Sequence, residues 1–189
     1  MGKNKTIFLD RDGTINKEVN YLSSKQQLEY LPGTITALKL LASDNWQLII
    51  LTNQSGVARG LITEDQLRDI HNYMLETLKR DDIKITHIYY CPHHPDYGEK
   101  VDCDCRKPKP GMIFKAAQEF QIDLHHSYLV GDKLDDILAG QAAGLKSVLV
   151  KTGYGEKQWR ENSQKAEVTP DYIFDDLLEF AKWVVNKGE

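Results

Sequence analysis

Near its start the chain reads Ile7-Phe8-Leu9-Asp10-Arg11-Asp12-Gly13-Thr14, an apolar run that ends in two acidic residues. The apolar part is typical of a buried strand, and Gly13 turns the chain away after it. Asp10 and Asp12 repel each other within one loop unless a cation lies between them. Such a pair also offers a nucleophile and a general acid or base. The run therefore predicts a catalytic or metal-binding site at the end of this strand.

The composition indicates a single globular domain over residues 1–189. The net charge of −4 argues against a nucleic-acid partner, because such proteins carry a basic excess or a basic face. No apolar run approaches the roughly 18 residues of a membrane span, and no signal-peptide core is visible. We therefore expect a cytoplasmic protein without a membrane partner, and a monomer by default. The match of residues 1–6 to a myristoylation pattern is interpreted as chance.

Strand and helix patterns alternate along the chain, which predicts a parallel sheet with helices on both faces. The expected fold class is α/β, a Rossmann-like, doubly wound, mostly parallel sheet without a separate cap domain. In such sheets ligands bind outside the carboxyl ends of the strands. We interpret the polar stretch 153–170 as a surface excursion. The expected strands are 6–9, 47–51, 85–90, 127–130, 147–150 and 172–174, and the expected helices are 32–41, 63–78, 111–120, 134–143 and 177–185.

Polar residues follow three of these strands, namely Asp10 and Asp12, Thr52 and Asn53, and Asp132. Each cluster alone has a plain structural explanation: a solvated loop, a turn or a helix cap. Together, at one edge of a sheet, they favour phosphoryl transfer. The carboxylates would repel a phosphate ester unless Mg²⁺, which prefers oxygen ligands, offset their charge. Thr52 and Asn53 can donate hydrogen bonds to the phosphoryl oxygens.

A cation is also needed to neutralise charge in the transition state of phosphoryl transfer. The run Arg106-Lys107-Pro108-Lys109 offers several. We select Lys107 for this role, with Lys109 as the alternative. Without the other clusters, this run would be interpreted as a solvated turn.

Four motifs follow one another along the chain: Asp10-Arg11-Asp12-Gly13-Thr14, Thr52-Asn53, Lys107, and Gly131-Asp132 with Asp135 and Asp136. In this order they resemble the haloacid dehalogenase-like phosphohydrolase superfamily, over nearly the whole chain. The resemblance implies that Asp10 attacks phosphorus and forms an aspartyl-phosphate. It implies that Asp12 protonates the leaving oxygen and then activates the hydrolytic water. It also implies that Asp10, Asp132 and the main-chain carbonyl of Asp12 hold Mg²⁺, which leaves the Asp12 carboxyl group free to carry a proton.

All three cysteines lie in one loop, 91–105, in the pattern Cys91-x-His93 followed by Cys103-x-Cys105. An odd, clustered set in a reducing compartment favours metal ligands over disulfides. Three thiolates and one imidazole suit a closed, structural zinc site. His94 is the competing imidazole, and reduced thiols without metal are the alternative to zinc. We interpret the remaining histidines as surface or helix-face residues: His71, His87, His125 and His126.

Within the superfamily, the cysteine loop resembles two groups, one acting on a heptose bisphosphate and one on histidinol phosphate. The segments 19–33 and 107–112 resemble the first group, and no fused dehydratase domain is present. A sugar bisphosphate needs cations for the phosphate that stays. The resemblance implies Arg106 and Lys133 for this role, while Arg59 and Lys109 are chosen on proximity alone. The ammonium of histidinol phosphate needs an acidic partner, and we find none outside the catalytic carboxylates.

Two non-enzymatic readings compete with a phosphatase. Carboxylates clustered at a strand end also occur in receiver domains, which accept phosphate for signalling. A zinc-stabilised binding module is the second, and it would leave Asp10 without a chemical role. Neither accounts for both Lys107 and the cysteine loop.

Overall fold

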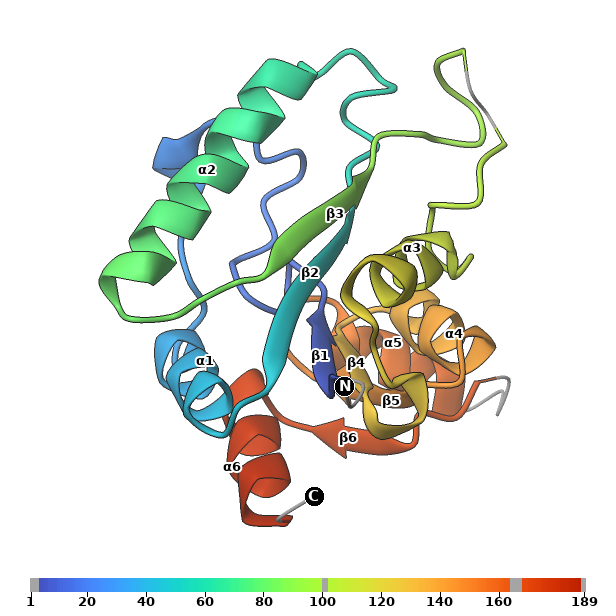
Figure 1. Cartoon of the computed structure of the whole chain (residues 1–189). Coiled ribbons are helices and arrows are strands. Elements are labelled where there is room, and N and C mark those ends of the chain that lie inside the picture. Colours follow the sequence, from blue (N-terminus) through green and yellow to red (C-terminus); the bar gives the residue numbers. More distant parts are fainter. Residues whose placement is uncertain (1–3, 100–101, 164–167, 188–189) are drawn as a thin grey trace.

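The computed structural model describes residues 4–99, 102–163 and 168–187, so part of the myristoylation pattern lies outside the described residues. Six strands form one sheet: β1 (Thr6–Leu9), β2 (Gln47–Asn53), β3 (His87–Cys91), β4 (Tyr128–Gly131), β5 (Lys146–Val150) and β6 (Tyr172–Phe174). Their order is β3-β2-β1-β4-β5-β6, and each neighbouring pair is parallel (Figure 1). The expected α/β class and parallel sheet are confirmed.

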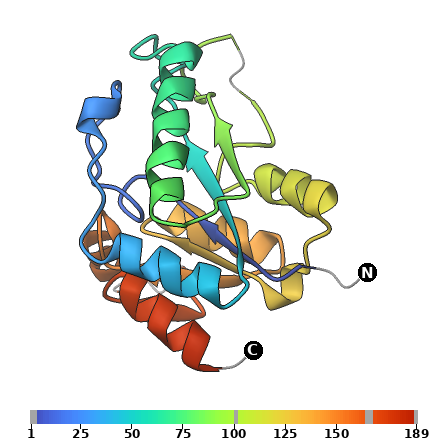
Figure 2. The ribbon, with the colours of Figure 1, turned by 60° about the vertical axis from the view of Figure 1, so that its left-hand side comes forward.

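Helices cover both faces of this sheet (Figure 2). On one face, the apolar sides of α1, α2 and α6 pack against Ile7 and Leu9 of β1. On the other, α3 and α4 pack around Phe8. These three β1 side chains are fully buried, and burying each stabilises the fold by about 1.5–3 kcal/mol. The helices are α1 (Thr34–Ser43), α2 (Glu64–Arg80), α3 (Gly111–Phe120), α4 (Leu134–Ala142), α5 (Gly155–Ser163) and α6 (Leu177–Lys187).

The stretch expected to be a surface excursion contains a helix, α5, so that interpretation was wrong over residues 155–163. The helix has few apolar residues, and polar contacts attach it to the rest of the fold. Gln158 accepts a hydrogen bond from the main-chain N–H of Leu134 at 2.6 Å, and Asn162 is 5% exposed and bonds both main-chain groups of Val168. Hydrophobic periodicity does not detect a helix that is attached in this way.

From β1 the chain runs to β2 and β3 on one side of that strand and then crosses to β4 on its other side, which places the switch point of the sheet at the carboxyl ends of β1 and β4. Open α/β sheets bind ligands in the crevice at such a point. The segment between β3 and α3 carries the cysteine loop and projects from this same edge (Figure 1). No helix in the described part of the chain is both long and apolar enough to cross a membrane.

Candidate active site

The carboxyl ends of β1, β2 and β4 bring the predicted residues together. Asp10 directly follows β1, and its N–H continues the sheet by donating to Val130 of β4 at 2.9 Å. Asp132 follows β4 and is fully buried, and Asp10 is 4% exposed. Thr52 is buried near the end of β2. Side chains far apart in the sequence thus meet at one edge of the sheet.

Lys107 reaches this cluster from the loop before α3. Its Nζ lies 2.7 Å from Asp10 Oδ1 and 2.5 Å from Asp136 Oδ1, and it donates to the Leu51 carbonyl at 2.8 Å. Burial alone would lower the pKa of Lys107, but the charges of Asp10 and Asp136 outweigh it and raise that pKa above its usual value. The lysine therefore stays charged beside the candidate nucleophile.

Asn53 fixes the main chain of this lysine. Its Nδ2 donates to the Lys107 carbonyl at 3.0 Å, and the Lys107 N–H donates to its Oδ1 at 3.1 Å. Both ends of the amide are therefore used in placing Lys107. Sequence reasoning gave Asn53 a contact with phosphate, and Asn53 also lines the pocket described below. The alternative lysine, Lys109, is half exposed and pairs with Asp102 at 2.6 Å, away from the carboxylates.

Three buried carboxylates, those of Asp10, Asp132 and Asp136, each place an oxygen within 4.8 Å of the others. Asp132 Oδ2 accepts from the Tyr154 N–H at 2.8 Å, while its buried Oδ1 has no hydrogen-bond partner among the described residues. Burial, and then the charges of Asp10 and Asp136, raise the pKa of Asp132 to about 8. A bound cation would relieve this repulsion. The excess charge and the unpartnered oxygen fit a hard divalent ion such as Mg²⁺.

The carboxylate of Asp12 is surrounded by a set of donors. Its Oδ2 accepts from Arg11 Nη2 at 2.7 Å and from Gln54 Nε2 at 2.9 Å, and its Oδ1 accepts from Arg11 Nε and Asn16 Nδ2. Burial alone would raise the pKa of Asp12, but the Arg11 charge and these hydrogen bonds together lower it. The carboxylate is therefore ionised in this arrangement.

A pocket of about 230 Å³ opens beside Asp12. Arg106 and Lys133, the two cations that the resemblance implies for substrate binding, both line it. Arg106 Nη1 donates to the His93 carbonyl at 3.1 Å, and Lys133 Nζ pairs with Glu18 at 3.0 Å. The lining residues are Asp12, Glu18, Asn20, Tyr21, Leu22, Asn53, Gln54, Ser55, Gly56, Arg106, Lys133, Asp135 and Tyr154. The charged lining comprises two cations, Arg106 and Lys133, and three carboxylates, Asp12, Glu18 and Asp135, which suits a polar ligand.

Arg59, which was chosen for its proximity in sequence, is not among the residues that line this pocket. Its guanidinium stacks on Tyr97 at 3.9 Å from the ring centroid and contacts His94 Nε2 at 3.0 Å. It therefore connects the segment after β2 to the cysteine loop. The structure gives Arg59 a place in packing this loop.

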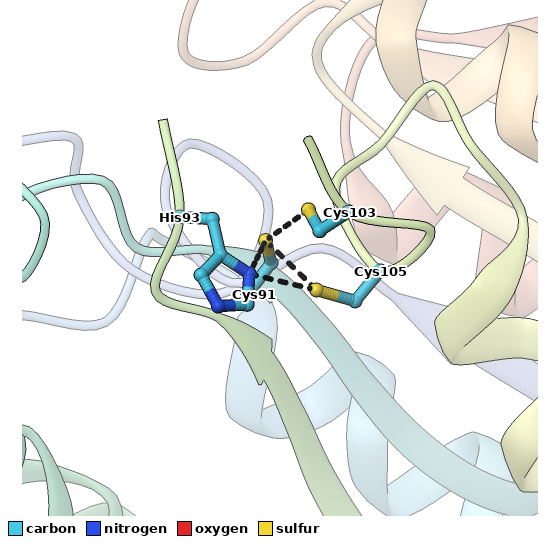
Figure 3. A group of neighbouring side chains, drawn as sticks. All are labelled: Cys91, His93, Cys103 and Cys105. Atoms are coloured by element: carbon cyan, nitrogen blue, oxygen red, sulfur yellow. Dashed lines mark hydrogen bonds between the residues drawn. The ribbon is translucent and has the colours of Figure 1, made fainter. Parts of the chain in front are cut away.

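The cysteine loop brings its four predicted ligands into one cluster (Figure 3). His93 Nδ1 lies 3.2 Å from Cys105 Sγ and 3.6 Å from Cys91 Sγ. Cys91 Sγ in turn lies 3.1 Å from Cys105 Sγ and 3.6 Å from Cys103 Sγ. Four nitrogen and sulfur atoms at such spacings can surround one tetrahedral ion with bonds of about 2.0–2.3 Å. The donor set fits zinc.

His94, the competing imidazole, is engaged elsewhere. Its Nε2 contacts Arg59, and its Nδ1 accepts from the Asp96 N–H at 3.0 Å. It is not part of the cluster formed by His93 and the cysteines. The geometry therefore favours His93 as the fourth ligand.

Sequence reasoning did not select several residues that the structure places at the site. Asp136 was quoted in a motif without a role, although it lies in the first turn of α4, which begins just after Asp132. The acidic lining residues Glu18 and Asp135 contradict the statement that no acidic partner is available. His71 lies on a helix face as expected, but that face is buried, at 7% exposure. No sequence pattern shows which side chains turn inward from a loop.

Comparison with known proteins defines the class to which this fold and site correspond. A family model described as HAD-hydrolase-like matches residues 104–180. The structure resembles that of a D,D-heptose 1,7-bisphosphate phosphatase from B. bronchiseptica complexed with magnesium and phosphate, with a TM-score of 0.87 and 33% identity. This match covers 97% of the present chain and 99% of the other.

Two relatives narrow the class further. The chain is 42% identical to D-glycero-beta-D-manno-heptose-1,7-bisphosphate 7-phosphatase of Pasteurella multocida, over 95% of this chain and 96% of the relative. It is 44% identical to D-glycero-alpha-D-manno-heptose-1,7-bisphosphate 7-phosphatase of Photorhabdus laumondii, over 85% and 90%. The chain therefore belongs to the family of D-glycero-D-manno-heptose-1,7-bisphosphate 7-phosphatases. The names of its relatives include both anomers, so the similarity does not select one.

Proposed function

We propose that this protein is a Mg²⁺-dependent phosphatase that removes the 7-phosphate of D-glycero-D-manno-heptose 1,7-bisphosphate. The observation that carries the proposal is the pairing of buried Asp10 with Lys107 Nζ at 2.7 Å, at the switch point of the sheet. A carboxylate held beside a charged lysine can attack phosphorus while the lysine stabilises the negative charge that develops. Similarity to the two named relatives supports the choice of substrate.

The reaction follows from the placement of the carboxylates. An oxygen of Asp10 forms a bond to phosphorus while the bond to the leaving oxygen breaks. Asp12, which is ionised in the arrangement described above, must first take up a proton, and it gives this proton to the leaving oxygen. In the second half, ionised Asp12 takes a proton from water as the water attacks phosphorus. The bond between Asp10 and phosphorus breaks, inorganic phosphate leaves, and Asp12 is again protonated. Lys107 stabilises the phosphoryl charge in both halves, and Thr52 lies at the same strand ends.

Two metal ions belong to the proposal. Asp10, Asp132 and the main-chain carbonyl of Asp12 would hold Mg²⁺, which when bound supplies positive charge against the phosphate and the carboxylates. Cys91, His93, Cys103 and Cys105 would hold a structural Zn²⁺. Because Arg106 donates to the His93 carbonyl, the zinc site also supports the wall of the pocket.

The phosphate that stays on the sugar is proposed to bind Arg106 and Lys133 in the pocket. Histidinol phosphate remains the second candidate substrate, because Glu18 and Asp135 in the same lining could accept its ammonium. Lys133 already pairs with the carboxylate of Glu18. When this pair opens, the lysine can bind another anion at the same position. The bisphosphate uses both cations and is therefore preferred.

The setting of the enzyme is part of the same proposal. We expect a single domain, acting as a monomer in the cytoplasm, with no nucleic-acid or membrane partner. Three cysteines that form no disulfide and that are proposed to bind a metal suit a reducing compartment. The net charge of −4 disfavours a polyanionic partner.

A substrate comparison tests the proposal. Phosphate release with Mg²⁺ is measured on the α- and β-anomers of the heptose bisphosphate and on histidinol phosphate. We expect kcat/KM on one heptose anomer to exceed that on histidinol phosphate by at least ~100-fold, the scale of about 3 kcal/mol in the transition state. A preference for histidinol phosphate would replace the proposed substrate, and absence of multiple turnover on every ester would refute a phosphatase.

A further inference from the structure

Arg11, which lies between the two catalytic carboxylates in sequence, is completely buried, and the reaction described above gives it no role. Burying a guanidinium costs free energy unless its N–H groups find acceptors. The positive charge of Arg11 is therefore kept at this position although its desolvation costs free energy. The contacts of the guanidinium indicate which side chains it orients.

The Arg11 guanidinium faces Asp12 with two of its nitrogens and His71 with the third. Nε and Nη2 donate to the two oxygens of Asp12 at 3.1 and 2.7 Å. Nη1 lies 3.0 Å from His71 Nε2. Because a guanidinium can only donate, His71 must accept at Nε2, which requires a neutral ring with its proton on Nδ1. Burial and then the Arg11 charge lower the pKa of His71 to about 3, in agreement with a neutral ring.

This arrangement controls the orientation of the Asp12 carboxylate. Asn16 and Gln54 each contact one of its oxygens, and only Arg11 contacts both. A planar fork against a planar carboxylate fixes the plane of the pair as well as their separation. His71, from α2, holds the far side of the fork and so limits its rotation.

We propose that Arg11, seated by the neutral ring of His71, is a positioning residue that sets the orientation of the Asp12 carboxyl group for proton transfer. The inference rests on the proposed function, because it assigns a role within that reaction. When the P–O bond breaks, the Asp12 proton must lie in line with the leaving oxygen. A tilt of the fork would misplace it without changing how the phosphate binds.

A different result is expected if Arg11 and His71 only link the loop after β1 to α2. Loss of a structural link would lower activity on all esters alike. Loss of proton positioning matters only where the leaving oxygen needs the proton. An alkoxide leaving from a sugar phosphate needs it, whereas the phenolate leaving from p-nitrophenyl phosphate is stable without it.

Two variants of His71 separate these roles. His71→Leu removes the acceptor, whereas His71→Gln restores one through its side-chain carbonyl. For His71→Leu we expect kcat on the sugar bisphosphate to fall at least ~10-fold and kcat on p-nitrophenyl phosphate less than ~3-fold, because misplacing the proton removes only part of the ~10²–10⁴-fold that general acid–base catalysis contributes. KM for the bisphosphate should not change, and His71→Gln should recover most of the loss.

Equal losses on both esters, no loss on either, or a Gln variant as impaired as the Leu variant would overturn the inference. Arg11→Lys, which keeps the buried charge but not the fork, provides the same comparison if His71→Leu does not fold. Its loss must again be larger on the sugar ester. The wild type gives the reference. If the wild type turns over neither ester, the proposed function fails. If the wild type is active but the variants lose no more activity on the sugar ester than on p-nitrophenyl phosphate, only the inference about Arg11 fails.

Discussion

At the scale of single residues, the site is organised by charge compensation in a buried volume. Lys107 is 3% exposed and lies between Asp10 and Asp136, while Asp132 has a buried oxygen without a hydrogen-bond partner among the described residues. Desolvated charges of one sign are tolerated only when a cation is near. The lysine supplies part of this compensation, and the remaining charge explains why a divalent ion fits.

Substitution of this lysine should therefore affect stability as well as activity. We expect Lys107→Met to lower the free energy of unfolding by about 3–5 kcal/mol, because it leaves buried carboxylates unpaired, and to abolish turnover. Lys109→Met is the matched control, since its pair with Asp102 is exposed and screened by solvent and should contribute far less to stability. Urea unfolding measures both. Equal stability of the two variants would contradict this account of Lys107.

At the scale of elements, the cysteine loop brings the side chains of Cys91, His93, Cys103 and Cys105 into one cluster. The loop between β3 and α3 places Arg106 in the pocket and Lys107 beside Asp10. His71 gives a comparable link between α2 and the loop after β1. In both cases an ordered part of the fold holds side chains of a neighbouring loop in place at the candidate active site.

The zinc proposal is tested by exchanging neighbouring histidines. We expect the wild type to contain about one zinc per chain. His93→Gln should lose the metal and lower the melting temperature, whereas His94→Gln should retain zinc, because His94 contacts Arg59 and lies outside the cluster. Metal analysis of the purified proteins gives the answer. Zinc retained by His93→Gln and lost from His94→Gln would reverse the assignment.

The buried neutral ring of His71 predicts a loss of stability in acid. Its pKa is about 3 when folded and about 6.5 when unfolded, so the unfolded chain binds the proton first as the pH falls. The stabilising difference is complete above pH 6.5 and is lost between pH 6.5 and 3. From pH 7 to 5, the wild type should lose on the order of 2 kcal/mol more than His71→Gln.

Chemical unfolding at the two pH values tests this difference. The exposed His126 provides a matched control, because it pairs with Asp123 at the surface. His126→Gln should follow the wild type to within about 1 kcal/mol. An acid sensitivity that His71→Gln shares fully with the wild type would show that other groups cause it.

At the scale of the whole molecule, the sequence was sufficient where a pattern has a fixed period or order. Alternating strands and helices predicted the parallel sheet, and the carboxyl ends of its strands predicted where Asp10, Thr52 and Asp132 would meet. The chain order of the motifs placed Lys107 as well. These inferences succeeded because the sheet topology determines which residues share an edge.

Features set by tertiary contacts were not predicted. The α5 helix is attached through polar side chains such as Gln158, which give no apolar stripe. The acidic residue Glu18 reaches the pocket from a loop whose course the sequence does not specify. Arg11 resembles an exposed loop residue in the sequence, yet it is buried because Asp12 and His71 satisfy its donors. In each case the partner lies on another element.

The central claim is that Asp10 is the nucleophile of a phosphatase, and phosphate release by the wild type and by Asp10→Asn tests it most directly. With Mg²⁺ and the heptose bisphosphates, we predict multiple turnover by the wild type. The variant should give no detectable release although its circular dichroism shows a folded protein, because an amide cannot form the aspartyl-phosphate. Turnover by Asp10→Asn at the wild-type rate would contradict the account.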